Sequence, residues 1–312
     1  RGLRFWKTNK SYKKLMELPI VNHPDYVAKI NDDNKFPIKK FEKLANHLKE
    51  NKIVKEFFIP KPCSFETLNE AHSKDYILKI KDKSLDLISQ KKIGFPLNDS
   101  VVQRSFVATG GTVLASKLAI NHGLACNTAG GSHHATFNEG AGFCVFNDVA
   151  VATRFLQKKG YARRILIVDL DVHQGNGTAD IFRDDSSVFT FSMHCKSNYP
   201  AKKTKSDLDV ELDDNLEDAK YLEILKKYIT YLNQESFDFV FYIAGVDIHH
   251  DDRLGKLKIT DQGIKKRDEI VIGNFYQKRI PLCGVLGGGY NKNFDKLVEL
   301  HSMLHKSCAE II

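Results

Sequence analysis

An α/β fold, with helices covering both faces of one central parallel sheet, is predicted by two features of this sequence. Short apolar runs that we expect to be strands occupy residues 164–169, 187–193, 237–244 and 280–286. Amphipathic segments that we expect to be helices lie between them, and this alternation favours parallel pairing of the strands. Because the runs have no polar alternate face, both faces of the sheet should be covered.

Helical patterns occur at residues 100–122 and near 147–159, 217–234, 260–278 and 293–311. In the first of these segments, apolar residues recur at roughly helical spacing. Residues 1–60 predict two further helices, broken by Pro24 and Pro37, and then an apolar run at 54–59. We find no repeat, low-complexity segment or flexible linker, so the simplest interpretation is one domain over residues 1–312.

The composition is typical of a globular protein from a reducing compartment. Of the 312 residues, 42% are hydrophobic and 28% are charged, and a chain of this length buries a core without disulfides. The six cysteines are scattered and form no CxxC pair, which indicates reduced thiols and a cytoplasmic location. No apolar run approaches a membrane span, and residues 1–14 do not resemble a signal peptide.

The formal net charge of +8 raises the question of an acidic partner. The lysines are scattered in pairs, however, and no aromatic residues are interleaved with them. This pattern indicates a solvated surface rather than a nucleic-acid interface. We therefore expect neither nucleic acid nor a membrane as the partner.

The clearest functional signal lies at the carboxyl ends of the predicted strands. These ends carry the sequences DLDVHQGNG, SMHCKSNYP, AGVDIHHDD and LGGGYN. Because ligands of parallel sheets bind beyond the carboxyl ends of the strands, the four clusters should share one site.

A metal site is predicted by the first cluster. Residues two apart in an extended segment point to the same side, so Asp171 and His173 can approach one ion while Asp169 lies behind them. Asp247, after the next strong strand, can supply a third ligand. Two carboxylates and one imidazole suit catalytic zinc, with iron(II) as the alternative. The competing interpretation is that these side chains only cap a strand.

Two adjacent histidines, His133 and His134, lie on a loop flanked by glycines. Imidazoles titrate near neutral pH, and an acceptor behind each ring would fix its tautomer. Asp169 and Asn176 are the candidates for these acceptors. The alternative is a pair of hydrogen-bonded histidines in an ordinary loop.

Three glycines precede Tyr290, and they would let the backbone pass close to a ligand. The hydroxyl of Tyr290 could then stabilise a developing oxyanion. A flexible turn with an exposed tyrosine is the alternative. The glycine run is not a GxGxxG after the first strand, so a dinucleotide site is not indicated.

Taken together, these motifs resemble the histone deacetylase family. GGSHHA, GAGFCVFND, DLDVHQGNGT, AGVDIHHDDRLG and LGGGYN occur in the family's order, and the resemblance extends over about residues 20–300. The details look most like class IV and its bacterial relatives. The resemblance implies an arginase-like, three-layer α/β/α fold with a central parallel sheet.

The resemblance also implies a role for each matching residue. It identifies Asp171, His173 and Asp247 as zinc ligands. It makes His134 the general base and acid with Asn176 behind it, and His133 an electrostatic aid backed by Asp169. Tyr290 would be the hydrogen-bond donor to the oxyanion. Many members of the family carry Asp where this chain has Asn176, and a neutral amide raises the basicity of His134 less than a carboxylate would. The class II and class IV branches share this Asn.

Substrate and potassium sites are implied in the same way. The carbonyl of Gly142 would accept the substrate amide N–H, while Phe143 and Tyr199 would line opposite walls of the acyl-lysine tunnel. A structural potassium ion is expected near Asp169, Asp171, His173, Ser192 and Met193.

The implied activity is zinc-dependent hydrolysis of the amide of acyl-lysine in a protein or peptide, with acetyl or longer acyl groups. An acetylpolyamine deacylase of the same superfamily is an alternative that needs acidic groups at the rim, where Asp207, Asp251 and Asp252 are candidates. A pseudo-enzyme that only binds acyl-lysine is the non-enzymatic alternative. An arginase-like hydrolase with two manganese ions is disfavoured, because the motif reads DxDxH rather than DxHxD.

A second histidine pair and a segment of mixed charge also lie near the predicted site. His249 and His250 follow Asp247, and we expect rim residues there rather than ligands for a second metal. Residues 202–214 carry mixed charge, and a solvated loop is favoured over a segment that reads substrate sequence.

Overall fold

The structure is a computed structural model that describes residues 17–31 and 34–312. Its centre is a seven-stranded sheet in the order β1-β2-β7-β6-β3-β4-β5, and every neighbouring pair is parallel. The strands are β1 (Ile20–Val21), β2 (Leu124–Asn127), β3 (Ile165–Asp169), β4 (Val188–Cys195), β5 (Leu208–Leu212), β6 (Phe239–Ile243) and β7 (Leu282–Val285).

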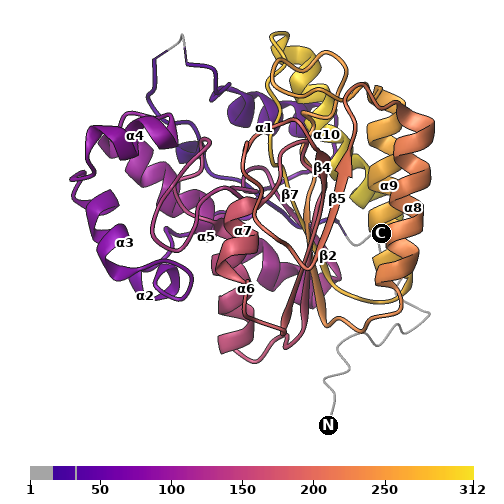
Figure 1. The fold of residues 1–312 in the computed structure, drawn as a ribbon, viewed down its shortest axis with the longest axis horizontal. Helices are drawn as coiled ribbons and strands as arrows, with labels where there is room; N and C mark the ends of the chain where they lie inside the picture. Colours follow the sequence, from indigo (N-terminus) through magenta and orange to yellow (C-terminus); the bar gives the residue numbers. More distant parts are fainter. Residues whose placement is uncertain (1–16, 32–33) are drawn as a thin grey trace.

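Helices cover both faces of this sheet, which gives three layers (Figure 1). The helices α5 (Asp99–His122) and α6 (Asp148–Lys158) pack together on one face, and α5 contacts β1, β2 and β7. On the other face, α8 (Asp218–Leu232), α9 (Asp261–Gln277), α10 (Phe294–Ile311) and α1 (Lys40–Glu50) form a continuous series of contacts. Shorter helices are η1 (Pro24–Tyr26), α2 (Phe65–Leu68), α3 (Lys74–Lys81), α4 (Leu87–Ile93) and α7 (Asn176–Ile181).

Polar side chains determine where several helices begin. Asn98, Asn147, Thr260 and Asn293 each accept a hydrogen bond from a backbone N–H in the first turn of α5, α6, α9 and α10. Such caps satisfy donors that the helix itself leaves without partners. The strands β2, β3, β6 and β7 are buried at every position, because helices cover both sides of them.

The predicted α/β architecture is confirmed, and the four predicted strands and five predicted helices lie within a few residues of the observed ones. Three strands were not predicted. The strand β1 is only two residues long, β2 is only four residues long, and β5 lies inside the segment expected to be a solvated loop. That last expectation is wrong for residues 208–212, which pair with β4 at the edge of the sheet.

The amino-terminal region also differs from the prediction. Pro24 begins the short helix η1 rather than ending a long one, and the first α-helix starts three residues after Pro37. Any helix within residues 1–16 lies outside the described residues. The 54–59 run contains only an isolated bridge from Phe58 to Val21.

All six cysteines are free and buried, in agreement with the predicted reduced state. Within residues 17–31 and 34–312, none of the helices has the length and apolarity that a membrane crossing needs.

Candidate active site

The candidate site lies beyond the carboxyl ends of four strands that are neighbours in the sheet. In the order β2, β7, β6 and β3, the loops that follow these strands carry His133 and His134, Tyr290, Asp247, and Asp171 with His173. Because all four strands are parallel, their following loops meet at one edge of the sheet. The structure therefore brings the predicted metal and catalytic residues together.

The three predicted metal ligands form one buried cluster. His173 Nδ1 lies 3.0 Å from Asp171 Oδ1 and 3.1 Å from Asp247 Oδ2. All three residues are at most 7% exposed, and their donor atoms converge on one point. Ligands about 2.1 Å from a tetrahedral zinc ion are separated by about 3.4 Å, so these spacings are close to those of a metal site.

The charges of this cluster also fit a divalent cation. Burial opposes the charge on His173, but its hydrogen bonds to the carboxylates of Asp171 and Asp247 outweigh this and raise the pKa of the imidazole to about 10. Burial and the negative charge of Asp171 raise the pKa of Asp247 to about 7. Two buried carboxylates thus share one imidazolium and remain short of positive charge, which a divalent ion would supply.

The histidine pair is held by the acceptors that the sequence suggested. His133 Nδ1 lies 2.7 Å from Asp169 Oδ2, and His134 Nδ1 lies 2.7 Å from Asn176 Oδ1. The amide oxygen of Asn176 is an acceptor, so His134 carries its proton on Nδ1 and leaves Nε2 with a lone pair. Both rings are buried, with centroids 4.2 Å apart.

The two rings differ in charge because their partners differ. Burial lowers the pKa of His133, but the charges of Asp169 and Asp171 outweigh this and raise it to about 9. Burial and the positive charges of His133 and His173 hold the pKa of His134 well below its usual value. At neutral pH, the pair therefore offers a cationic ring beside a neutral one.

Two glycines make room for these groups. Gly142 has φ +54°, and a Cβ atom added there would lie 2.5 Å from the ring of His134. A Cβ atom at Gly288 would lie 2.0 Å from a carboxylate oxygen of Asp247. The backbone N–H of Gly288 also donates to Asp171 Oδ2 at 2.6 Å, so the glycine run directly supports a predicted metal ligand.

Two of the three predicted substrate residues, Gly142 and Phe143, line the pocket beside these groups. Phe143 has its ring centroid 5.8 Å from that of Tyr290, and both line the pocket with His133, His134 and Asp171. Tyr199 is 44% exposed, and its ring stands edge-on to His134 at 4.8 Å. Burial and the charge of Asp247 hold the pKa of Tyr290 well above its usual value, so its hydroxyl keeps its proton.

The expected potassium residues lie on β3, on β4 and in the loop after β3. Ser192 is the register partner of Asp169 in the β3–β4 ladder, and Met193 follows it in β4. The hydroxyl of Ser192 lies 3.0 Å from His194 Nδ1, and Asp169 Oδ1 accepts the backbone N–H of Asp171.

Sequence reasoning missed a buried lysine beside the pocket. Lys40 Nζ lies 3.5 Å from the carbonyl oxygens of Gly287 and Gly289 and 3.1 Å from His301 Nε2. Burial lowers the pKa of Lys40 to about 8. A lysine on an amphipathic helix is usually exposed, so no local signal in the sequence points to this position.

Two further residues support Tyr290 and were likewise not predicted to do so. Asp252 Oδ2 accepts the backbone N–H of Tyr290 at 2.7 Å, and Arg253 Nε donates to the carbonyl of Tyr290 at 2.6 Å. Both follow Asp247 in the same loop, so one loop carries a predicted metal ligand and positions the tyrosine.

Comparison with known proteins agrees with this geometry. Residues 34–304 match the family model described as histone deacetylase domain. An uncharacterized protein from Picosynechococcus is 46% identical and covers 95% of this chain and 100% of its own length. Histone deacetylase 2 of Arabidopsis thaliana is 30% identical, covering 84% of this chain and 71% of its own. The crystal structure of the HDA15 HD domain superposes with a TM-score of 0.82 at 19% identity, over 94% of this chain and 88% of that one.

Proposed function

Since the chain belongs to the histone deacetylase family, we propose that it hydrolyses the amide of acyl-lysine in proteins or peptides with the help of zinc. Hydrolysis of the deacetylase type follows from family membership, while the metal and the lysine substrate are our proposal. The observation that carries it is the convergence of Asp171, His173 and Asp247 in one buried cluster, of which Asp171 lines a pocket together with His134 and Tyr290. The products would be a carboxylate and the free lysine.

Asp171, His173 and Asp247 would hold the zinc ion, for which their spacing and their deficit of positive charge are suited. Iron(II) suits the same donors. When bound, the ion would polarise the substrate carbonyl and lower the pKa of a water molecule.

We assign proton transfer to the histidine pair. His134 is neutral near pH 7 and has its lone pair on Nε2, so it can take a proton from the attacking water. The same atom can then return the proton to the leaving amine. His133, kept cationic by Asp169, would stabilise negative charge that develops in the pocket.

Tyr290 would stabilise the oxyanion. Its raised pKa keeps the hydroxyl protonated, and a fixed donor of this kind acts most strongly where water is excluded. Asp252 and Arg253 hold the backbone of Tyr290 on both its N–H and its carbonyl, which limits the movement of the ring.

The acyl-lysine chain would lie between Phe143 and Tyr199, with the Gly142 carbonyl accepting the amide N–H. Support for this placement comes from the contacts of Tyr199 with His134 and of Phe143 with Tyr290.

A structural potassium ion would be held by Asp169, Asp171, His173, Ser192 and Met193. The free cysteines support a reducing compartment, and we propose the cytoplasm.

A polyamine substrate is less well supported than acyl-lysine. Asp252 already accepts three backbone N–H groups, and Asp207 accepts both the N–H and the hydroxyl of Thr190. Of the three acidic candidates, Asp251 has the most freedom to bind a polyamine cation, with a side chain that is 58% exposed.

Purified protein incubated with an acetyl-lysine peptide tests the proposal. We expect release of acetate that a chelator abolishes and that added zinc restores. Peptides with acyl chains of increasing length would define the pocket depth, and acetylspermidine tests the polyamine alternative. Chelator-resistant hydrolysis would refute the metal assignment, and binding of the peptide without turnover would indicate a pseudo-enzyme.

A further inference from the structure

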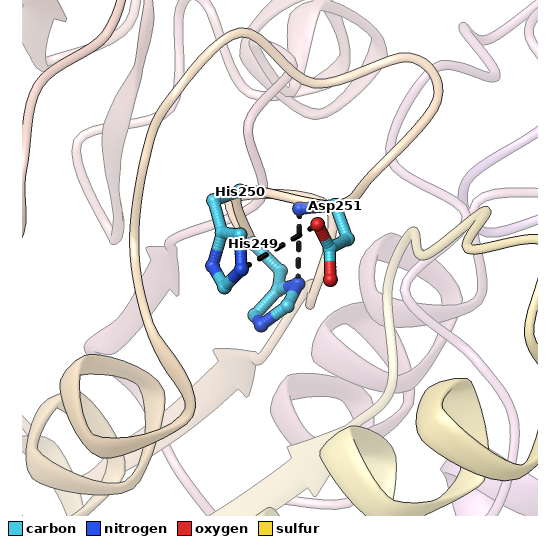
Figure 2. A group of neighbouring side chains, drawn as sticks. All are labelled: His249, His250 and Asp251. Carbon is cyan, nitrogen blue, oxygen red and sulfur yellow. Dashed lines mark hydrogen bonds and ion pairs between the residues drawn. The ribbon is translucent and has the colours of Figure 1, made fainter.

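A second pair of histidines lies in the loop between β6 and α9, outside the pocket described above. His249 is buried, whereas the next two residues, His250 and Asp251, are exposed. Figure 2 shows the three side chains close together in this loop. The planes of the two rings are tilted by 37° to each other. The ring centroids are 4.1 Å apart, and the possible ligand atoms of the three residues lie within 4.8 Å of one another.

The tautomer of His249 is determined by its neighbours. Its Nε2 lies 2.9 Å from Asp261 Oδ1, a carboxylate that can only accept, so Nε2 carries the proton. Its Nδ1 accepts the backbone N–H of Asp251 at 3.2 Å and therefore holds the lone pair. Lys296 forms an ion pair with Asp261 and keeps that carboxylate in place. A carboxylate behind the distal nitrogen is the usual support of a metal-binding histidine.

His250 is arranged in a similar way. Its Nδ1 lies 3.3 Å from the carbonyl oxygen of Ile259, which is an acceptor, so this nitrogen carries the proton. The lone pair then lies on Nε2, and this atom is 3.4 Å from Asp251 Oδ1. The backbone is also fixed, since the N–H of His250 donates to the carbonyl of Ile259 and that of Asp252 to the carbonyl of His249.

We propose that His249 Nδ1, His250 Nε2 and a carboxylate oxygen of Asp251 form a second site for a divalent transition-metal ion such as zinc. Donors around a tetrahedral zinc ion are separated by about 3.4 Å, which is already the spacing between His250 and Asp251. Rotation of these two exposed side chains brings them to His249, whose ring stays fixed. Water fills the remaining position, and imidazole donors favour zinc, copper or nickel over calcium or magnesium.

The ion would take the place of the Asp251 N–H at the lone pair of His249 Nδ1, so this peptide group would turn away while those of His250 and Asp252 keep their hydrogen bonds. This N–H belongs to an exposed residue, so water can take over as its partner. The three ligands lie between Asp247 and Asp252, and Asp252 accepts the backbone N–H of Tyr290. A bound ion would hold this stretch of the loop together. Zinc bound here should therefore stabilise the folded protein in addition to any ion held by Asp171.

Zinc stoichiometry, measured on dialysed protein by atomic emission, tests the site. We expect two zinc ions per chain for the wild-type protein and one for His250→Gln and for Asp251→Asn. His122→Gln is the matched control, because His122 ends α5 at the opposite edge of the sheet, and it should retain two. Because His250 and Asp251 are exposed, both variants should fold, and circular dichroism checks this.

A variant of the first site separates the two ions. Asp171→Asn should lose one zinc ion and keep the one that His250→Gln removes, so the second site stands even if the first binds another metal. Zinc in excess of the first equivalent should raise the melting temperature of the wild-type protein and of His122→Gln, but not that of His250→Gln. A His250→Gln protein that retains as many zinc ions at saturation as the wild-type protein would overturn the proposal.

Discussion

The two histidine pairs of this protein, His133–His134 and His249–His250, are the same dipeptide in different surroundings. Both follow strands at the carboxyl edge of the sheet, the first after β2 and the second after β6. Their ring centroids are 4.2 and 4.1 Å apart. In the first pair both rings are buried, whereas in the second only His249 is buried.

The partners behind the rings account for the different chemistry. The carboxylate of Asp169 makes His133 a cation, while the neutral amide of Asn176 leaves His134 a base, so one pair contains both members of an acid–base set. Burial lowers the pKa of His249, and the hydrogen bond to Asp261 only partly offsets this. His249 therefore presents a lone pair rather than a charge, which suits a metal ion more than proton transfer.

The largest effect that should separate the pairs is on turnover. His134→Gln removes the proposed base, and we expect kcat to fall by about 10²- to 10⁴-fold because general acid–base catalysis contributes about that much. Glutamine can still donate to Asn176, so the pocket should keep its shape. Steady-state kinetics with an acetyl-lysine peptide measure this, and His122→Gln should retain wild-type activity. A loss at His250→Gln as large as that at His134→Gln would remove the distinction between the pairs.

Tyr290→Phe should have the next largest effect on the first site. Loss of one oxyanion donor lowers kcat by about 100- to 1000-fold, whereas KM should change little because the ring remains. The hydroxyl forms no hydrogen bond with any of the described residues, and the backbone is held by Asp252 and Arg253, so the variant should fold normally. Turnover at the wild-type rate would remove Tyr290 from the mechanism.

Asp261→Asn sharpens the comparison from the second pair. An amide can turn its NH₂ group toward His249 Nε2, which releases the tautomer that directs the lone pair of Nδ1 to the ion. Loss of such a supporting carboxylate weakens metal binding by about 10- to 100-fold, and we expect this for the second zinc ion only. Isothermal titration with zinc measures both sites in one experiment. If Asp261→Asn weakened the tighter of the two zinc sites instead, the second zinc ion would not be bound by His249.

The sequence predicted the central strands and the site because both depend on strong local patterns. The strands β3, β6 and β7 consist almost entirely of apolar residues, and each is followed by a polar or glycine-rich cluster. The edge strand β5 alternates between buried and exposed residues, and β1 is too short to have any periodicity. Such strands are determined by the neighbour with which they pair, so their own residues carry little signal.

The residues that the sequence did not reveal are those whose role depends on distant contacts. Lys40 is buried only because carbonyls of Gly287 and Gly289 and the ring of His301 surround it, more than 240 residues away along the chain. The metal ligands were recognisable because two of them lie two residues apart. The second histidine pair was recognised, but its ligand character depends on Asp261 and Ile259, whose positions only the fold reveals.

The smallest expected effect tests why the two rings of the first pair differ. Asn176→Asp places a carboxylate 2.7 Å from His134 Nδ1, where the amide oxygen now accepts. The pKa of His134 lies well below its usual value, and an adjacent negative charge should raise it by about one to three units. A general base works only when it is neutral, so kcat/KM falls as the pH drops through its pKa, and a raised pKa moves this fall to higher pH. Profiles of kcat/KM from about pH 5 to about pH 9 measure the shift. Asn233→Asp adds the same charge at the opposite edge of the sheet, after α8, and should leave the profile in place. If the acidic limb stayed unchanged in Asn176→Asp, the group that limits activity at low pH would not be His134, and the charge difference within the pair would have no catalytic role.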